Sequence, residues 1–251
     1  MDLGLTDRVY VLTGASRGLG YATAECLVAD GARVVIAGRT QSTVDEAVER
    51  LGSRAAGAVA DLGDPATPAR LVALAHQRFG RLDGALISVG GPPSGSVYST
   101  SDEAWLSSFQ TVYLGTLRLA RAVVDGLTDG GAIALVLSSS ARAPISGLGI
   151  SNGLRPGLAG AAKDLADELG PRGVRVVSLL PGRFLTGRNV QLFAETGDPE
   201  RAAAEAAAAI PLRRIGEPTE FGRVAAFVLS PAASYMSGIS LLVDGGSTRA
   251  L

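Results

Sequence analysis

The sequence predicts a single-domain α/β fold built on a doubly wound parallel sheet of about seven strands. Short apolar runs rich in β-branched residues alternate with longer helical patterns from one end of the chain to the other. Most of these runs are continuously apolar, as expected of parallel strands that helices cover on both faces. The chain has 251 residues, of which 47% are hydrophobic, and no repeat or linker divides it. We therefore expect one domain over residues 1–251.

Seven apolar runs are the predicted strands. In chain order they are Arg8–Thr13, Arg33–Ala37, Ala56–Ala60, Gly84–Val89, Ala132–Leu137, Val174–Leu180 and Ser240–Val243. The main helical patterns between them are Gly18–Asp30, Gln41–Leu51, Pro65–Phe79, Asp102–Gly126 and Leu154–Leu169. Several of these helices are followed by a glycine that can form a left-handed C-terminal cap, namely Gly31, Gly52, Gly80 and Gly170.

Two segments fit neither a strand nor a covering helix. Residues 90–95 read GGPPSG after the fourth strand, and their glycines and prolines favour a shaped loop. Residues 183–214 follow the sixth strand and contain an Ala-rich helix over Glu200–Ile210. Ligands of such sheets bind outside the carboxyl ends of the strands, so both segments should border the ligand site. The Ala-rich helix is then either a mobile lid or a strong helix former on the surface.

Composition argues against several classes of protein. A net charge of −1, with acids and bases interspersed, gives no electrostatic footprint for nucleic acid. One cysteine and one histidine do not support a disulfide framework, a multi-cysteine zinc site or a Ser-His-Asp triad, and we expect no metal. No window approaches 18 uncharged apolar residues, and the N-terminus MDLGLTDR does not resemble a signal peptide. We expect a soluble, cytoplasmic protein without a membrane partner.

A glycine-rich turn follows the first strand and opens the first helix. Residues 13–20 read TGASRGLG, and glycines here allow a tight turn and the approach of a pyrophosphate to the backbone. The N-terminus of the helix adds free N–H groups and a partial positive charge. This arrangement predicts a dinucleotide site of the Rossmann type. Its expected residues are Gly14, Ser16, Arg17, Gly18, Leu19 and Gly20.

The end of the second strand favours NADP(H) over NAD(H). Sites specific for NAD place a carboxylate there, which binds the 2′-hydroxyl of the ribose. Residues 36–40 read IAGRT and contain no acid. Arg39 and Arg17 can instead bind a 2′-phosphate through their guanidinium groups. The alternative is that both arginines are solvated surface residues.

The motifs resemble those of the short-chain dehydrogenases/reductases, most closely the 3-oxoacyl-[acyl-carrier-protein] reductase-like branch. The resemblance rests on residues 13–20, on the pair Asp61-Leu62, on Pro181-Gly182 with Thr186, on PTE at 218–220 and on VDGG at 243–246. It implies that Asp61 and Leu62 flank the adenine. Thr186 and the backbone at Pro181 and Gly182 would contact the nicotinamide end.

The resemblance also implies a position for the loop after the fourth strand and an oligomeric state. Residues 88–91 read SVGG where the family usually has Asn-Asn-Ala-Gly, which places Gly90 beside the cofactor. The last helix and strand resemble the family segments that build a tetramer. Apolar core packing explains the same pattern, but we expect a homo-oligomer, either a tetramer or a dimer.

The catalytic residues of the family are mostly replaced. Its reaction uses a serine, a tyrosine and a lysine, usually with an asparagine, and this chain has no Tyr-x-x-x-Lys. The resemblance places Ser151 at the tyrosine position and Arg155 at the lysine position. Ser138, thirteen residues before Ser151, is at the position of the catalytic serine, and Tyr113 falls near the asparagine position. Of the four residue types, only the serine is retained.

Two hypotheses about function follow. In the first, the protein is an NADP(H)-dependent oxidoreductase acting on a small carbonyl or alcohol, and Arg155 holds the nicotinamide ribose. Ser151 is a weaker acid than a phenol, and loss of a positioned general acid forfeits about 10²–10⁴ in rate. Tyr113, Tyr98 or a water relayed by Ser151 could then supply the proton. In the second hypothesis, the protein binds NADP(H) without turnover, as a sensor or scaffold.

Overall fold

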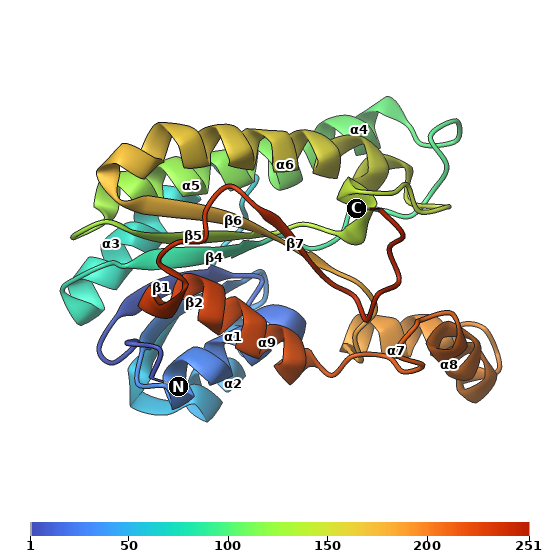
Figure 1. The fold of residues 1–251 in the computed structure, drawn as a ribbon, viewed down its shortest axis with the longest axis horizontal. Helices are drawn as coiled ribbons and strands as arrows, with labels where there is room; N and C mark the ends of the chain where they lie inside the picture. The colour runs from blue at the N-terminus through green and yellow to red at the C-terminus, as the bar shows by residue number, and fades with distance from the viewer. Residues whose placement is uncertain (1, 251) are drawn as a thin grey trace.

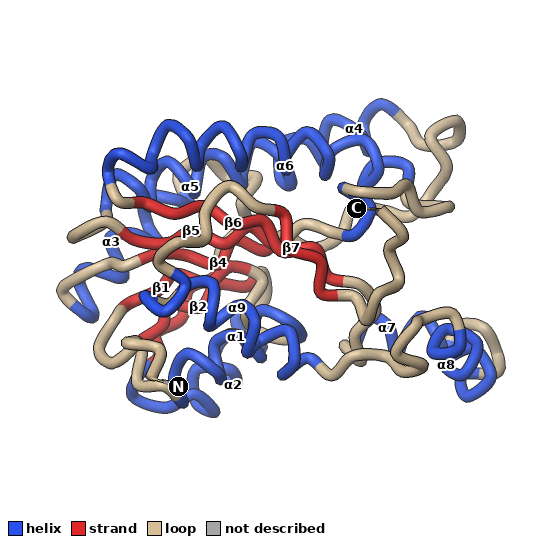
Figure 2. The backbone as a smooth tube through the Cα atoms, in the orientation of Figure 1, coloured by secondary structure: helices blue, strands red, loops and turns tan. Residues whose placement is uncertain are grey.

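The computed structural model describes residues 2–250 and contains a seven-stranded, fully parallel sheet. The strands follow the order β3-β2-β1-β4-β5-β6-β7. Helices cover both faces of the sheet (Figures 1 and 2). The predicted class, a doubly wound α/β domain, is confirmed.

Each predicted strand is present, and no strand end differs from its predicted position by more than one residue. The strands are β1 (Val9–Thr13), β2 (Arg33–Gly38), β3 (Ala55–Val59), β4 (Gly84–Ser88), β5 (Gly131–Val136), β6 (Val174–Pro181) and β7 (Ser240–Val243). Side chains of each inner strand alternate between two apolar cores. In β1, Tyr10 and Leu12 join one core and Val9 and Val11 the other. The first core lies beneath α1, α2 and α9, and the second beneath α3, α5 and α6 (Figure 1).

The helices differ more from the prediction than the strands do. They are α1 (Gly18–Ala29), α2 (Gln41–Leu51), α3 (Thr67–Phe79), α4 (Asp102–Ser108), α5 (Gly115–Gly126), α6 (Gly149–Leu169), α7 (Gly187–Ala194), α8 (Pro199–Ala208) and α9 (Pro218–Leu229). The single helix expected over 102–126 is divided, because a π-helical turn over Phe109–Leu114 separates α4 from α5. Such turns are frequent at functional sites.

Helix α6 begins at Gly149, five residues before its predicted start. The loop of residues 95–97 packs onto this first turn, and a Cβ on Gly149 would lie 2.8 Å from the backbone nitrogen of Val97. Glycine is required there by this close approach, although glycine in a sequence usually indicates a loop. At the other end, Gly170 is not the left-handed cap we expected: its φ is −52°, and a 3₁₀ turn continues to Gly173, whose φ is 71°.

The segment 183–214 contains two helices instead of one. Helix α8 corresponds to the expected Ala-rich helix, and α7 was not predicted. The two helices contact each other, and Ala206, Ile210 and Ile215 form a small apolar cluster with Phe193. Figures 1 and 2 show α7 and α8 projecting from the main body. Whether the pair moves as a lid stays a prediction.

Two general features bear on function. None of the helices within residues 2–250 is both long and apolar enough to cross a membrane. In the same part of the chain, no three His, Cys, Asp or Glu side chains are grouped so that they could hold a metal ion.

Candidate active site

The glycine-rich turn connects β1 to α1 at the switch point of the sheet. β1 has β2 on one side and β4 on the other, which opens a crevice at the carboxyl ends of these strands. Gly14 and Gly18 have φ values of 59° and 61°, in the left-handed region that favours glycine. A Cβ on Gly20 would lie 2.5 Å from the Gly14 carbonyl oxygen. The turn can therefore present backbone N–H groups to a pyrophosphate.

Two arginines flank this turn. A Cβ on Gly38 would lie 2.7 Å from Ser16 Oγ, so the turn packs against the end of β2. Arg17 immediately precedes α1 and Arg39 immediately follows β2, and both side chains are exposed. Within residues 2–250 neither side chain forms an ion pair. Both guanidinium groups are available to a phosphate at this edge of the crevice.

The residues expected around the adenine, Asp61 and Leu62, follow the end of β3, which pairs in parallel with β2. Leu62 is buried, and its carbonyl oxygen would lie 2.4 Å from a Cβ on Gly115. Asp61 is exposed, and its Oδ1 accepts a hydrogen bond from the backbone N–H of Gly63 at 2.8 Å. A Cβ on Gly90 would meet no atom within 4 Å in the described part of the chain. The loop after β4 is therefore open at this point.

The segment after β6 comes back to the glycine-rich turn. Gly182 donates its N–H to the carbonyl oxygen of Val243, which fixes the end of β6, including Pro181, beside β7. Thr186 precedes α7, and its Cγ2 would lie 3.7 Å from a Cβ on Gly18. The structure thus places Thr186, which is expected at the nicotinamide end of the cofactor site, beside the glycine-rich turn, which is expected at the pyrophosphate.

Ser151 and Arg155 lie on one face of α6, because residues four apart in a helix are neighbours. Both are buried, with 7% and 4% of their surface exposed. Arg155 Nη1 donates to the carbonyl oxygen of Val136, at the end of β5, at 2.8 Å. This face of α6 therefore meets the carboxyl edge of the sheet, next to the crevice.

Arg155 is a buried cation that lacks a counter-charge. Its Nε has no hydrogen-bond partner within residues 2–250, and no ion pair of this part of the chain includes it. Burial lowers the pKa of the guanidinium to about 10, which keeps it charged at neutral pH. A buried polar group without a partner is destabilising. The site is thus suited to a ligand that supplies a hydrogen-bond acceptor here.

Ser140 is a member of the site that the sequence did not reveal. Its Oγ lies 2.9 Å from Ser151 Oγ, and both hydroxyls are buried. Ser138, the predicted catalytic serine, is half-buried, and its Oγ accepts the backbone N–H of Ser140 at 3.1 Å. Ser138 thereby orders the 3₁₀ turn over Ser139–Ala141 that presents Ser140 to Ser151. The serine run at 138–140 was the available signal.

The two tyrosines considered as proton donors lie elsewhere. The Tyr113 hydroxyl donates to the carbonyl oxygen of Gly157 at 3.4 Å, and its ring stacks on Phe109. Gly157 is two residues beyond Arg155, so it is about 200° around the helix from it. The structure therefore does not bring Tyr113 to the Ser151 face of α6. Tyr98 is fully exposed on the loop that packs against the start of this helix.

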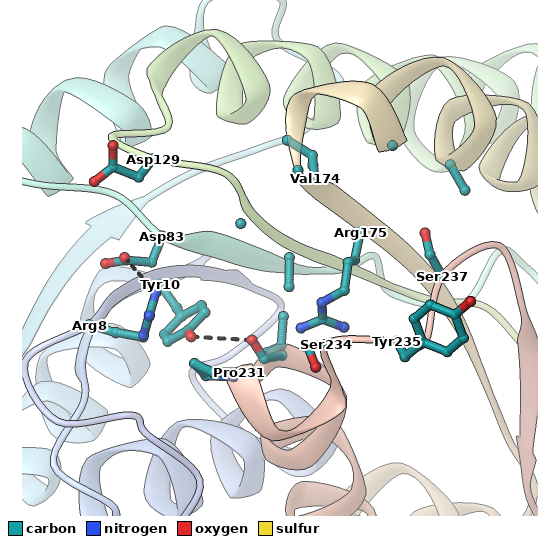
Figure 3. A pocket seen from close by; sticks show the side chains of 16 residues that line it. Arg8, Tyr10, Asp83, Asp129, Val174, Arg175, Pro231, Ser234, Tyr235 and Ser237 are labelled. Atoms are coloured by element: carbon teal, nitrogen blue, oxygen red, sulfur yellow. Dashed lines mark hydrogen bonds and ion pairs between the residues drawn. The ribbon is translucent and has the colours of Figure 1, made fainter.

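A cavity of about 540 Å³ lies at the opposite edge of the sheet, among the amino ends of the strands (Figure 3). Several of its polar groups have partners within the protein. The Tyr10 hydroxyl donates to the carbonyl oxygen of Leu229, and Asp83 pairs with Arg8. Arg175 donates to three backbone carbonyl oxygens. These contacts hold the base of the fold together, and we do not place the active site here.

The chain is similar to known proteins over nearly its whole length. A family model described as enoyl-(acyl carrier protein) reductase matches residues 14–248. The chain is 32% identical to human dehydrogenase/reductase SDR family member 4 over 254 residues, covering 98% of this chain and 90% of that protein. It is 36% identical to an uncharacterized oxidoreductase of Mycobacterium tuberculosis over 251 residues, covering 97% and 93%.

Solved structures resemble this protein along its whole length. L-sorbose reductase from Gluconobacter frateurii, complexed with NADPH and L-sorbose, has a TM-score of 0.96 and 28% identity, with full coverage of both chains. A short chain oxidoreductase from Pseudomonas aeruginosa, described as containing an atypical catalytic center, has a TM-score of 0.93 and 28% identity, again with full coverage of both chains.

Proposed function

Because this chain belongs to the short-chain dehydrogenase/reductase family and is an oxidoreductase of that type, we propose that it transfers hydride between NADP(H) and a carbonyl or alcohol substrate. In this proposal Ser151 and Arg155 act where the family has tyrosine and lysine. The observation that carries it is the buried guanidinium of Arg155, whose Nε lacks a partner beside the hydroxyl of Ser151. A ribose hydroxyl of the cofactor would supply the missing acceptor.

The residues around the crevice fit a bound dinucleotide. In the turn at 13–20, side chains at Gly14 and Gly20 would collide with the backbone, and Gly18 has a left-handed φ of 61°; the turn opens α1 toward the crevice. Arg17 and Arg39 offer two unpaired cations and no carboxylate, which suits a 2′-phosphate. We assign cofactor contacts to Gly14, Ser16, Arg17, Gly18, Leu19, Gly20, Arg39, Asp61, Leu62, Gly90, Arg155, Pro181, Gly182 and Thr186.

The bound cofactor supplies or accepts the hydride, and this chain's own residues handle the substrate oxygen. In the reducing direction the carbonyl carbon gains a hydride and its oxygen becomes an alkoxide. The Ser151 hydroxyl donates a hydrogen bond and then its proton to that oxygen, and Ser151 recovers a proton from water, either directly or by relay through Ser140, which is itself reprotonated by water. The fixed charge of Arg155 stabilises the negative charge during the transfer. Ser138 holds the turn that carries Ser140.

Two solved relatives support this proposal. The relative from Gluconobacter frateurii holds NADPH and L-sorbose, so a fold of this shape accommodates a phosphorylated dinucleotide and a carbonyl substrate. The relative from Pseudomonas aeruginosa is described as containing an atypical catalytic center, so another family member of this fold departs from the usual residues. The chain we describe departs from them at the tyrosine and lysine positions.

The second candidate is a protein that binds NADP(H) without turning a substrate over. The replacement of both the tyrosine and the lysine favours it. The two candidates share the cofactor site and differ only in chemistry, so binding and turnover have to be measured separately.

The first experiment is a calorimetric titration of the protein with NADPH and, separately, NADH. We expect micromolar binding of NADPH and much weaker binding of NADH. In Arg39→Ala the difference between the affinities for NADPH and NADH should be smaller. Arg78→Ala is the control, because Arg78 is an exposed arginine on α3. Binding of neither cofactor would contradict the proposal. Binding without oxidation of NADPH by any carbonyl compound would instead favour the second candidate.

A further inference from the structure

We infer that Asn152, which follows Ser151 in α6, is a positioning residue for the paired hydroxyls of Ser140 and Ser151. The inference rests on the proposed function, since it concerns the two serines that handle the substrate oxygen there. Ser140 Oγ and Ser151 Oγ lie 2.9 Å apart, a contact that a small shift of either backbone would break. The side chain of Asn152 bonds the segment of chain that joins the two serines, so it acts on them through the backbone.

This joining segment, residues 142–148, leads from the 3₁₀ turn that carries Ser140 to the start of α6. Residues 142 and 144–147 are exposed, so the segment has little packing of its own to fix its path. The amide of Asn152 bonds its midpoint twice. Oδ1 accepts the backbone N–H of Ile145 at 2.9 Å, and Nδ2 donates to the carbonyl oxygen of Ile145 at 2.8 Å. Asn152 thus ties the middle of the segment to the helical turn that carries Ser151.

Pro156 makes this first turn of α6 more dependent on such contacts. It lies inside the helix, and a proline has no N–H to donate to the carbonyl oxygen four residues earlier, which is that of Asn152. On the outer side of the turn, the N–H of Gly149 donates to the carbonyl oxygen of Gly95 at 2.9 Å. The turn that carries Ser151 therefore depends on contacts with two loops, namely the loop after β4 and residues 142–148.

Trp105 gives this turn a built-in probe. It is the only tryptophan of the chain, and a Cβ on Gly153 would lie 2.7 Å from Trp105 Cη2. Figure 1 shows α4, which carries Trp105, beside the beginning of α6. The indole thus packs on the residue that follows Asn152. A shift of the turn changes the surroundings of the indole whether or not a substrate is turned over.

The test is Asn152→Leu, which keeps the size of the side chain and removes both hydrogen bonds to Ile145. Activity is measured with saturating NADPH and the fastest of the carbonyl probes ethyl acetoacetate, benzaldehyde and L-sorbose. We expect kcat to fall at least roughly tenfold, because misplaced hydroxyls no longer meet the substrate oxygen. The Kd for NADPH should stay the same, since Arg155 keeps its bond to the carbonyl oxygen of Val136. Without cofactor, the quenching of Trp105 fluorescence by acrylamide should increase.

Pro156→Ala, added to Asn152→Leu, supplies a rescue. It gives residue 156 an N–H that can donate to the carbonyl oxygen of residue 152, so the helix itself holds the turn. We expect kcat to recover severalfold and the quenching to return toward that of the original protein. Asn189→Leu is the matched control. The amide of Asn189 donates to the carbonyl oxygen of Phe184 at 2.8 Å, in the segment after β6, and its loss should leave the quenching of Trp105 unchanged.

The same kcat and the same quenching in Asn152→Leu and in the original protein would overturn the inference. A combined loss of kcat, NADPH affinity and unfolding free energy would overturn it too, because that pattern indicates general damage and not the shift of one turn. So would a double variant that is no better than Asn152→Leu. An original protein that binds NADPH but reduces no carbonyl compound would remove the proposed turnover. The quenching of Trp105 in Asn152→Leu and in the double variant then decides by itself whether Asn152 holds the turn.

Discussion

At the scale of single residues, Arg155 determines the charge of this site. The charge of a lysine can be tuned by burial, but a guanidinium stays protonated over a wider range of pH. Burial lowers the pKa of Arg155 to about 10, which is still well above neutrality. Ser151 does not titrate in this range, whereas a tyrosine at its position would. The site therefore holds a fixed cation beside a neutral hydroxyl.

The pH dependence of turnover follows from this pKa. We expect kcat/KM for NADPH-dependent reduction to be nearly constant from pH 6 to pH 9. It should fall as the pH rises through about 10, because the guanidinium then loses the proton that makes it a cation. In Arg155→Lys the fall should come at lower pH, since a lysine has a free pKa of about 10.4 and burial lowers it. If kcat/KM fell at the same alkaline pH in Arg155→Lys and in the original protein, the role of the Arg155 charge in turnover would be contradicted.

Ser140 provides the second prediction at this scale. Ser140→Ala removes the hydrogen-bond partner of the buried Ser151 hydroxyl, and we expect kcat to fall roughly three- to tenfold. The Kd for NADPH should not change. Ser139→Ala is the control from the same turn, because Ser139 makes no side-chain hydrogen bond within residues 2–250. Ser140→Thr keeps a hydroxyl and should restore most of the rate; equal kcat in Ser139→Ala and Ser140→Ala would exclude the pairing as a contributor.

Part of this site could be predicted from sequence alone. The spacing between Ser138 and Ser151 gave the register that places Arg155 on the same helix face, and the structure brings Ser151 and Arg155 together as expected. Ser140 was missed because its partner is eleven residues away and only the 3₁₀ turn brings the two hydroxyls together. Tyr113 was assigned to the site from the family resemblance, at the position of the asparagine. It lies in a π-helical turn, and periodicity does not reveal such a turn.

At the scale of elements, Arg175 connects β6 to the end of α9. Its Nη1 donates to the carbonyl oxygens of Val228 and Met236, and its Nη2 to that of Ser230. The last carbonyls of a helix have no partner inside the helix, so a cation at this end both bonds them and meets the helix dipole. Arg175 thus acts as a C-terminal cap supplied by another element.

Arg175→Ala should lower the free energy of unfolding by about 2–4 kcal/mol, because it removes the guanidinium donor from the carbonyl oxygens of Val228 and Met236 and leaves that of Ser230 with only the N–H of Ala233. Chemical denaturation followed by circular dichroism measures this change. Arg78→Ala, on an exposed face of α3, should change the free energy by less than about 0.5 kcal/mol. The affinity for NADPH, whose proposed site is at the opposite edge of the sheet, should be the same in both variants. If Arg175→Ala and Arg78→Ala had similar free energies of unfolding, Arg175 would not act as a helix cap.

Elements differ in how well their sequences predict them. The inner strands are continuous apolar runs that two cores bury, so their ends are found to within one residue. Helix α7 was missed because it is only 8 residues long and begins at a glycine, which usually indicates a loop, and because it packs on the projecting helix α8. The start of α6 was missed because a tertiary contact, the approach of residues 95–97, accounts for its glycine. The local sequence pattern predicts well the elements that the core buries. It predicts less well the elements whose position depends on contacts with loops.

At the scale of the whole molecule, the two edge strands of the sheet differ in how many apolar side chains they expose. β3 and β7 are the edge strands. In β3 the exposed position near the end is Val59, whereas all four residues of β7 are half-exposed and three of them are large and apolar. The apolar side of α9 is buried in the core, so core packing explains the pattern of that helix. The case for an oligomer therefore depends on β7, whose outer side pairs with no strand within residues 2–250.

An exposed apolar edge strand is a site of association unless something covers it, and a second copy of this chain is the expected cover. We predict a dimer or tetramer in size-exclusion chromatography with light scattering. Ile239→Lys, which puts a charge beside β7 on a residue that is 38% exposed, should shift the protein toward the monomer by at least tenfold in Kd. Val59→Lys is the matched control on the other edge strand, where the side chain is 44% exposed, and it should leave the assembly intact. The same shift in both variants would show nonspecific repulsion. A monomeric original protein would refute the prediction.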